Sequence, residues 1–153
     1  MGMMDYVVTY PAGIVVDERV KKFISSFYEV SDDPSRNGEW VNYFTPDASL
    51  VMGDKKARGI RDIRTLRESM WEKIKSRRHK LDKVFPAAFA LPEHESERQF
   101  EYMIYGSVDL ELKGGEKMAG QWAGRAVLRD DEGRLKYAFY QVYIHTYVGT
   151  ATP

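Results

Sequence analysis

Residues 99–148 read QFEYMIYGSVDLELKGGEKMAGQWAGRAVLRDDEGRLKYAFYQVYIHTYV, and they are the most informative part of the chain about its fold. Apolar and polar residues alternate along much of it, which is the period of a half-buried strand. The pattern predicts three long strands, over residues 99–112, 117–129 and 135–148. Between them lie KGGE at 113–116 and DDEG at 130–133, whose glycines suit tight hairpin turns. Three strands joined by two short turns predict an antiparallel meander.

The residues before the meander have the spacing of amphipathic helices. Asp17 is placed to cap a first helix, and Asp33 followed by Pro34 is placed to open a second. Apolar spacing predicts a third helix that runs from about residue 60 to about residue 76. Three shorter strands are expected over residues 48–52, 56–58 and 79–85.

Helices followed by an antiparallel meander indicate an α+β domain. We expect a single domain over residues 17–148, with an N-terminal arm over 1–16 and a tail over 149–153. The 153 residues are enough for one domain with a core of its own.

The composition excludes several classes of function. The 23 Lys and Arg balance the 23 Asp and Glu, so there is no overall field to attract nucleic acid or an anionic membrane. Without cysteine there are no disulfides and no thiolate chemistry, and three histidines argue against a His-rich metal site. We therefore expect no metal, no cofactor, no nucleic-acid partner and no membrane partner. The lack of a signal-like start and of a long apolar run predicts a cytoplasmic protein.

The basic run KIKSRRHK at residues 73–80 allows two interpretations. One is an anion-binding or nucleic-acid-binding patch. The other is a solvated end of the third predicted helix, where cations interact favourably with the helix dipole. We favour the second, because the run is short and the whole chain is neutral.

Three stretches resemble the nuclear transport factor 2-like superfamily, also called SnoaL-like. They are EWVNYFTPDA at 39–48, RHKLDKV at 78–84 and KYAFYQVY at 136–143. The resemblance covers about residues 17–148. It implies helices packed in the concave face of a curved, mainly antiparallel sheet, which forms a cone with an internal pocket.

The resemblance also implies a range of functions. The superfamily includes dehydratases, isomerases and polyketide cyclases, together with non-catalytic binding domains, and its outer sheet faces often carry homodimer contacts. Scytalone dehydratases place a Tyr-Asp pair after the first helix, where this chain reads SDDP at 31–34. Their pocket histidine matches His79, whereas their second catalytic histidine has no counterpart in residues 99–112.

His79 is the candidate catalytic residue. An imidazole at the mouth of an apolar cone can accept or donate a proton near neutral pH. In an ideal strand His79 shares a face with Leu81 and Phe85, which predicts an inward side chain. Asp82 lies on the opposite face and would need a bulge to orient His79. The alternative is a histidine with a purely structural hydrogen bond, or one on the surface.

Aromatic and polar side chains are candidates for lining the pocket. Aromatic rings with a polar tip suit a flat or polycyclic ligand, although ordinary core packing is the alternative for each. Gln141 and Tyr143 would donate hydrogen bonds to a substrate oxygen if their face points inward, or would lie in a dimer interface if it points outward. The predicted pocket residues are Tyr28, Trp40, Tyr43, Tyr102, Trp122, Gln141 and Tyr143.

These expectations describe a cofactor-independent isomerase, dehydratase or cyclase. Its small-molecule ligand would be hydrophobic, oxygenated and cyclic, and His79 would transfer a proton. The alternative is a non-catalytic ligand-binding or homodimeric interaction domain of the same fold.

Overall fold

The computed structural model describes residues 3–89, 93 and 98–148. Within these residues one sheet has the strand order β2-β1-β6-β5-β4-β3, and only β1 and β6 pair in parallel. The strands are β1 (Phe44–Met52), β2 (Lys55–Arg58), β3 (Ile74–Ala87), β4 (Gln99–Leu112), β5 (Lys117–Asp131) and β6 (Arg134–Val148). The predicted meander is therefore confirmed as β4, β5 and β6.

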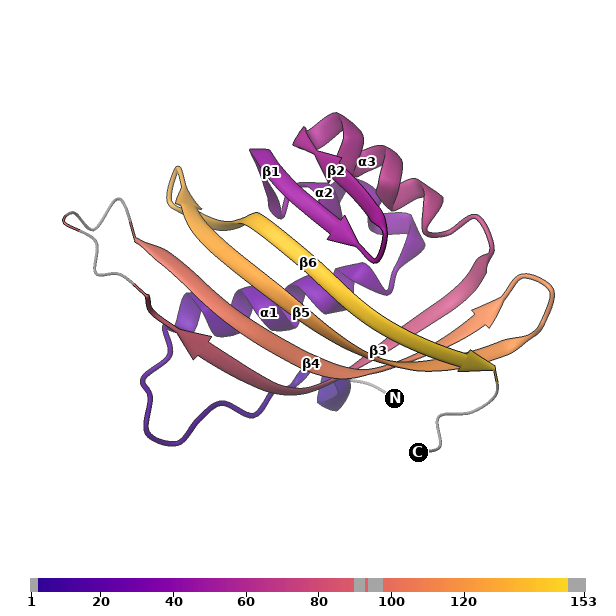
Figure 1. Ribbon diagram of the computed structural model, residues 1–153, viewed down its shortest axis with the longest axis horizontal. Helices are drawn as coiled ribbons and strands as arrows, with labels where there is room; N and C mark the ends of the chain where they lie inside the picture. Colours follow the sequence, from indigo (N-terminus) through magenta and orange to yellow (C-terminus); the bar gives the residue numbers. More distant parts are fainter. Residues whose placement is uncertain (1–2, 90–92, 94–97, 149–153) are drawn as a thin grey trace.

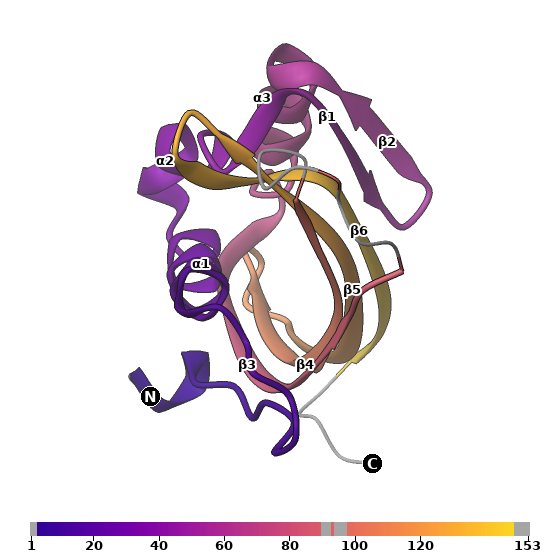
Figure 2. The same ribbon diagram turned by 90° about the vertical axis from the view of Figure 1, so that its left-hand side faces the viewer.

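The helices lie on the concave side of the bent sheet, as Figures 1 and 2 show for α1. They are η1 (Met3–Tyr6), α1 (Glu18–Ser31), η2 (Pro34–Arg36), α2 (Asn37–Val41) and α3 (Gly59–Ser69). The side chains of Asp17 and Asp33 cap α1 and η2, as predicted. The result is an α+β cone, which confirms the predicted fold class. No helix among the described residues is long and apolar enough to cross a membrane.

The core is an aromatic cluster between α1 and the sheet. Phe27 is at its centre, with its ring centroid 4.8 Å from that of Tyr137 and 5.6 Å from that of Trp40. Trp40 also lies 4.8 Å from Phe44, and all four rings are buried. Because aromatic side chains bury large apolar areas and pack edge to face, this cluster holds the helices in the cone.

The third helix is shorter than predicted. It ends at Ser69, and the chain enters β3 at Ile74, so the basic run at 73–80 lies mostly in a strand. The favoured interpretation of that run as a helix end is therefore wrong. β3 is the edge strand of the sheet, and charged side chains are common on edge strands because they discourage pairing with another chain.

Two bulges set which side chains face the core. The register of β3 against β4 shifts between Leu81 and Lys83, and that of β6 against β5 shifts around Ala138. A bulge adds one residue and reverses the alternation beyond it. Val84 is therefore buried, whereas Phe85 is 53% exposed and stacks on Tyr105. The prediction that Phe85 shares the inner face with His79 is wrong for this reason.

Gly106 is the residue of β4 that makes room for the bulge in β3. It pairs with Leu81, and a Cβ atom at this position would lie 2.1 Å from the carbonyl oxygen of Lys80. No carbon and oxygen approach this closely without a bond, so any side chain here must displace the backbone of β3.

We expect Gly106→Ala to lower the free energy of unfolding by about 1–3 kcal/mol, because overpacking forces the backbone to shift. Urea denaturation followed by circular dichroism would measure the change. Gly114→Ala is the matched control, since a Cβ atom there meets no atom within 4 Å. Equal loss in the two variants would contradict the assignment of Gly106 to the bulge.

Candidate active site

A cavity of about 120 Å³ lies between α1 and the inner face of the sheet. Much of its wall is apolar or aromatic, with contributions from Phe27, Met52, Val108 and Val142. Two tyrosines, a serine, two arginines and a histidine also line it: Tyr28, Tyr140, Ser31, Arg67, Arg77 and His79. An apolar hollow with a few converging polar groups is the usual form of a small-molecule site.

His79 reaches the cavity from β3, with its ring between Tyr28 and Trp122. The centroid of the His79 ring lies 5.3 Å from that of the Tyr28 ring and 5.4 Å from that of the Trp122 ring. Its Nδ1 atom lies 2.5 Å from Oδ1 of Asp32, whose side chain is only 6% exposed. None of the described residues forms a hydrogen bond with Nε2. Since Nδ1 is engaged by Asp32, Nε2 is the nitrogen available to a molecule in the cavity.

Asp32 joins three segments of the chain. Its Oδ2 atom accepts hydrogen bonds from the backbone N–H of His79 and from the Tyr6 hydroxyl, both at 2.8 Å. Its own backbone N–H donates to the carbonyl of Tyr28 in the last turn of α1. The carboxylate thus fixes the position of His79 relative to α1 and to the N-terminal arm.

The N-terminal arm is held against β3 near this carboxylate. Asp5 forms an ion pair with Arg78 at 3.0 Å, and the Arg78 guanidinium lies 5.3 Å from the centre of the Tyr6 ring. Burial and the negative charge of Asp32 raise the pKa of Tyr6. Its hydroxyl therefore keeps its proton and remains a hydrogen-bond donor to Asp32.

Tyr28 on α1 and Tyr140 on β6 form a pair of buried phenols. Their oxygens are 2.6 Å apart. Burial raises the pKa of both, so both are neutral near pH 7. One hydroxyl donates to the other, which leaves the proton of the acceptor free to form a hydrogen bond to an oxygen atom in the cavity.

The side chain of Arg67 extends from α3 to the C-terminal end of α1 and the start of α2. Its Nε donates to Oδ1 of Asn37 at 2.7 Å, and its Nη2 donates to the carbonyl of Val30 at 3.4 Å. The guanidinium also lies 4.9 Å from the centre of the Trp40 ring. Burial, and the charge of Arg77, lower the pKa of Arg67 to about 9, so the group is still charged at neutral pH.

Arg77 lies on β3, two residues before His79 and on the same face. Its Nη2 donates to the carbonyl of Met70 at 3.1 Å, and its guanidinium lies 4.5 Å from the centre of the Trp71 ring. Burial lowers the pKa of Arg77 as well. The Cα atoms of residues i and i+2 of a strand are about 6–7 Å apart, so Arg77 and His79 leave the same face of β3 as neighbours, and both line the cavity.

Several solved structures have this architecture. A hexachlorocyclohexane dehydrochlorinase (LinA) of type 2 has a TM-score of 0.67 at 10% identity, over 88% of this chain and 89% of that chain. A LinA-type3 dehydrochlorinase from Novosphingobium barchaimii has a TM-score of 0.64 at 11% identity, over 86% and 87%. Aln2 from a Streptomyces species has a TM-score of 0.64 at 15% identity, over 82% and 88%. No family model matches this chain, and no curated protein matches its sequence.

The chain has the nuclear transport factor 2-like fold. The predicted resemblance is thereby confirmed at the level of the fold, which by itself selects no function.

The nuclear transport factor 2-like cone brings some of the predicted site residues together. Tyr28, Trp40 and Trp122 line the cavity with His79. Tyr102 is fully buried on the inner face, but it belongs to the core and not to the cavity lining. Tyr43 is half-buried and packs against Phe23 and Phe27 instead.

Gln141 and Tyr143 do not line the cavity. They alternate with the buried Tyr140 and Val142, so they lie on the outer face of the sheet. Of the two orientations that the sequence left open, the structure has the outward one. The bulge near Ala138 explains why Tyr137 and Tyr140, three residues apart, both face inward.

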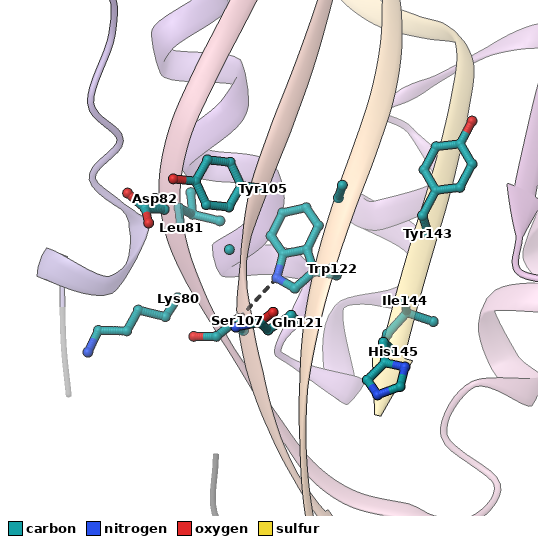
Figure 3. A pocket seen from close by; sticks show the side chains of 12 residues that line it. Lys80, Leu81, Asp82, Tyr105, Ser107, Gln121, Trp122, Tyr143, Ile144 and His145 are labelled. Atoms are coloured by element: carbon teal, nitrogen blue, oxygen red, sulfur yellow. Dashed lines mark hydrogen bonds between the residues drawn. The ribbon is translucent and has the colours of Figure 1, made fainter. Parts of the chain in front are cut away.

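A second, more open pocket of about 740 Å³ lies on the outer face. Figure 3 shows Lys80 and Asp82 of β3 on one side of it, and Tyr143 and His145 of β6 on the other. Trp122 contributes from the inner face, and its indole N–H donates to the carbonyl of Ser107 at 3.0 Å. Asp82 therefore points away from His79 and Asp32, although β3 does contain a bulge there.

The residue that sequence reasoning missed is Asp32. The signal was available, because the SDDP segment at 31–34 occupies the place where the resemblance implies an aspartate. That signal is weak, because no tyrosine precedes Asp32 and because Asp32 and His79 lie on different elements. Arg67, Arg77 and Tyr140 were also missed, since nothing in local sequence shows that they converge on one cavity. The described residues contain no group of three acidic or histidine side chains that could hold a metal ion.

We expect Asp32→Asn to change the tautomer of His79. The wild-type carboxylate accepts a hydrogen bond from Nδ1–H, whereas the amide of Asn would donate a hydrogen bond to an unprotonated Nδ1 and leave the ring proton on Nε2. Imidazole ¹⁵N chemical shifts at alkaline pH distinguish the two tautomers. Asp33→Asn is the matched control, because Asp33 caps η2 and Asn is an equally good cap. An Nε2–H tautomer already present in the wild-type protein would contradict the assignment.

Proposed function

We propose that this protein is a cofactor-independent enzyme that transfers a proton on a small cyclic substrate, with His79 as the base. The observation that carries the proposal is the buried contact between Asp32 and Nδ1 of His79, which leaves Nε2 available to the cavity. An oriented imidazole in a largely apolar hollow is suited to general base catalysis.

The chemistry follows from the groups that surround the cavity. Nε2 of His79 takes a proton from a carbon next to a carbonyl or to a leaving group, and Asp32 stabilises the imidazolium that forms. The free proton of the Tyr28–Tyr140 pair is donated to the substrate oxygen on which negative charge develops. Isomerisation follows if the imidazolium returns the proton to another atom, and elimination follows if a leaving group departs.

The comparisons support this kind of enzyme. Two of the structural neighbours are, by name, dehydrochlorinases of hexachlorocyclohexane, so the cone is compatible with an elimination from a ring compound. The substrate of the present protein is a separate question, because its cavity has its own lining. The proposed substrate class is a hydrophobic, oxygenated ring.

A panel of cyclic ketones and cyclic β-hydroxyketones tests the proposal. In D₂O, the enzyme should place deuterium at the α-carbon or release water, and mass spectrometry detects both. His79→Gln should lower the rate by about 10²–10⁴-fold, the usual contribution of a general base. His145→Gln is the matched control, because His145 lies on the outer face of the sheet.

Two results would count against the proposal. An active wild-type protein whose rate is unchanged by His79→Gln would exclude His79 as the base. Binding of the ketones without any deuterium exchange would favour the alternative, a non-catalytic ligand-binding domain of the same fold.

We also propose that the outer face forms a homodimer contact. Tyr105 and Tyr143 are exposed there beside the outer pocket. Lys80 and Asp82 flank the pocket, and within the described part of the chain neither forms an ion pair. Because a two-fold axis presents the same patch to itself, Lys80 can face the partner subunit's Asp82.

The dimer is tested by light scattering after size-exclusion chromatography. We expect the wild-type protein at twice the mass of the chain, and Tyr143→Asp at the mass of one chain, because a carboxylate in the apolar part of the contact would be desolvated without a partner. Lys55→Asp, at the far edge of the sheet, should remain dimeric. A monomeric wild-type protein would rule out the contact.

A further inference from the structure

Arg67 and Arg77 present two positive charges to the cavity, and no acidic side chain lines it. Neither arginine forms an ion pair with any described residue. A guanidinium has five N–H donors. Those on Nη1 of Arg67, and on Nε and Nη1 of Arg77, have no hydrogen-bond partner in the part of the chain that the structure describes. The site therefore has spare donors, and the only acidic group that the two arginines have in common is Asp32, whose oxygens already contact His79 and Tyr6.

Structural roles account for only part of this arrangement. Arg67 bonds to the carbonyls of Val30 and Asp33 at the C-terminal end of α1, where a cation is favourable. Arg77 has a single hydrogen bond, to Met70. Its neighbour Arg78 faces the other way and pairs with Asp5, which shows that β3 can place an arginine where a carboxylate is available. Burying the Arg77 cation instead is costly unless an anion joins it.

The remaining walls of the cavity indicate what the anion is attached to. The indoles of Trp40 and Trp122 line it, with aliphatic side chains between them. A volume of about 120 Å³ is close to that of engineered apolar cavities that bind a single benzene ring. A molecule that fits both the two arginines and the wall lined by indoles has one anionic group and one ring.

We infer that the cavity binds a small ring carboxylate, with the carboxylate at Arg67 and Arg77 and the ring against Trp40 and Trp122. This inference names the substrate class and rests on the proposed function in placing the reacting carbon at His79. Since Arg77 and His79 are neighbours on one face of β3, a carboxylate held by Arg77 brings the carbon beside it within reach of the imidazole. The two arginines then also stabilise the negative charge that proton removal puts onto the carboxylate.

Binding of benzoate, compared with benzamide, tests the inference without requiring turnover. The two probes have the same shape and differ in charge, so isothermal titration calorimetry isolates the contribution of the arginines. We expect benzoate to bind about 10- to 100-fold more tightly, the range for hydrogen bonds to a charged group. Cyclohexanecarboxylate and acetate extend the test to a saturated ring and to no ring.

Arg77→Gln should reduce benzoate binding to the level of benzamide. Arg64→Gln, on the exposed face of α3, is the matched control and should leave binding unchanged. If Arg77→Gln fails to fold, NMR of the wild-type protein tests the same contact. The Nε–H resonance of Arg77 should then change its chemical shift when benzoate is added. Equal affinity for benzoate and benzamide, or no binding of any of the carboxylates, would overturn the inference.

The results also separate this inference from the proposed function. Charge-selective binding of carboxylates that is unaffected by His79→Gln, with no proton transfer on any substrate, would support the ligand class and reject the enzyme. Proton transfer on neutral ketones, with no preference for carboxylates, would support the enzyme and reject the ligand class.

Discussion

The carboxylate of Asp32 is the constraint on which the site depends. It is nearly buried, and a buried charge is tolerated only when its hydrogen-bonding capacity is used. The backbone and ring of His79 and the hydroxyl of Tyr6 use it, and these groups come from β3 and from the N-terminal arm. One side chain therefore ties the end of α1 to the edge of the sheet and sets the direction of the imidazole. The structural role and the proposed catalytic role are the same set of contacts.

The sheet positions the rest of the site through its irregularities. Up to Leu81, β3 turns Arg77 and His79 inward, and the bulge that follows keeps Val84 in the core while Phe85 moves outside. This bulge is possible because Gly106 has no side chain opposite it. A regular strand would place Asp82 and Val84 on the same face, and the core would then lose an apolar residue or gain a carboxylate.

The aromatic cluster around Phe27 fills most of the cone and leaves the cavity small. Tyr28 and Tyr140 close one side of it with neutral phenols, while Arg67 and Arg77 bring positive charge to another. The proton acceptor, His79, lies on β3, and the hydrogen-bond donors Tyr28 and Tyr140 lie on α1 and β6. The cations Arg67 and Arg77 lie on α3 and β3. Such a division among rigid elements holds the groups in place more firmly than a loop would.

Features that depend on near neighbours in the chain could be predicted from the sequence. The alternation and glycine turns of residues 99–148 predicted the meander, Asp17 and Asp33 predicted the caps, and His79 was correctly placed on an inward strand position. The contacts of His79 depend on the folding of distant segments and could not be predicted in this way. Asp32 lies 47 residues away in the chain, and Arg67 reaches the cavity from a different helix. The bulges at Asp82 and Ala138 were likewise decided by pairing with other strands, because an extra residue in one strand is defined only against its partner.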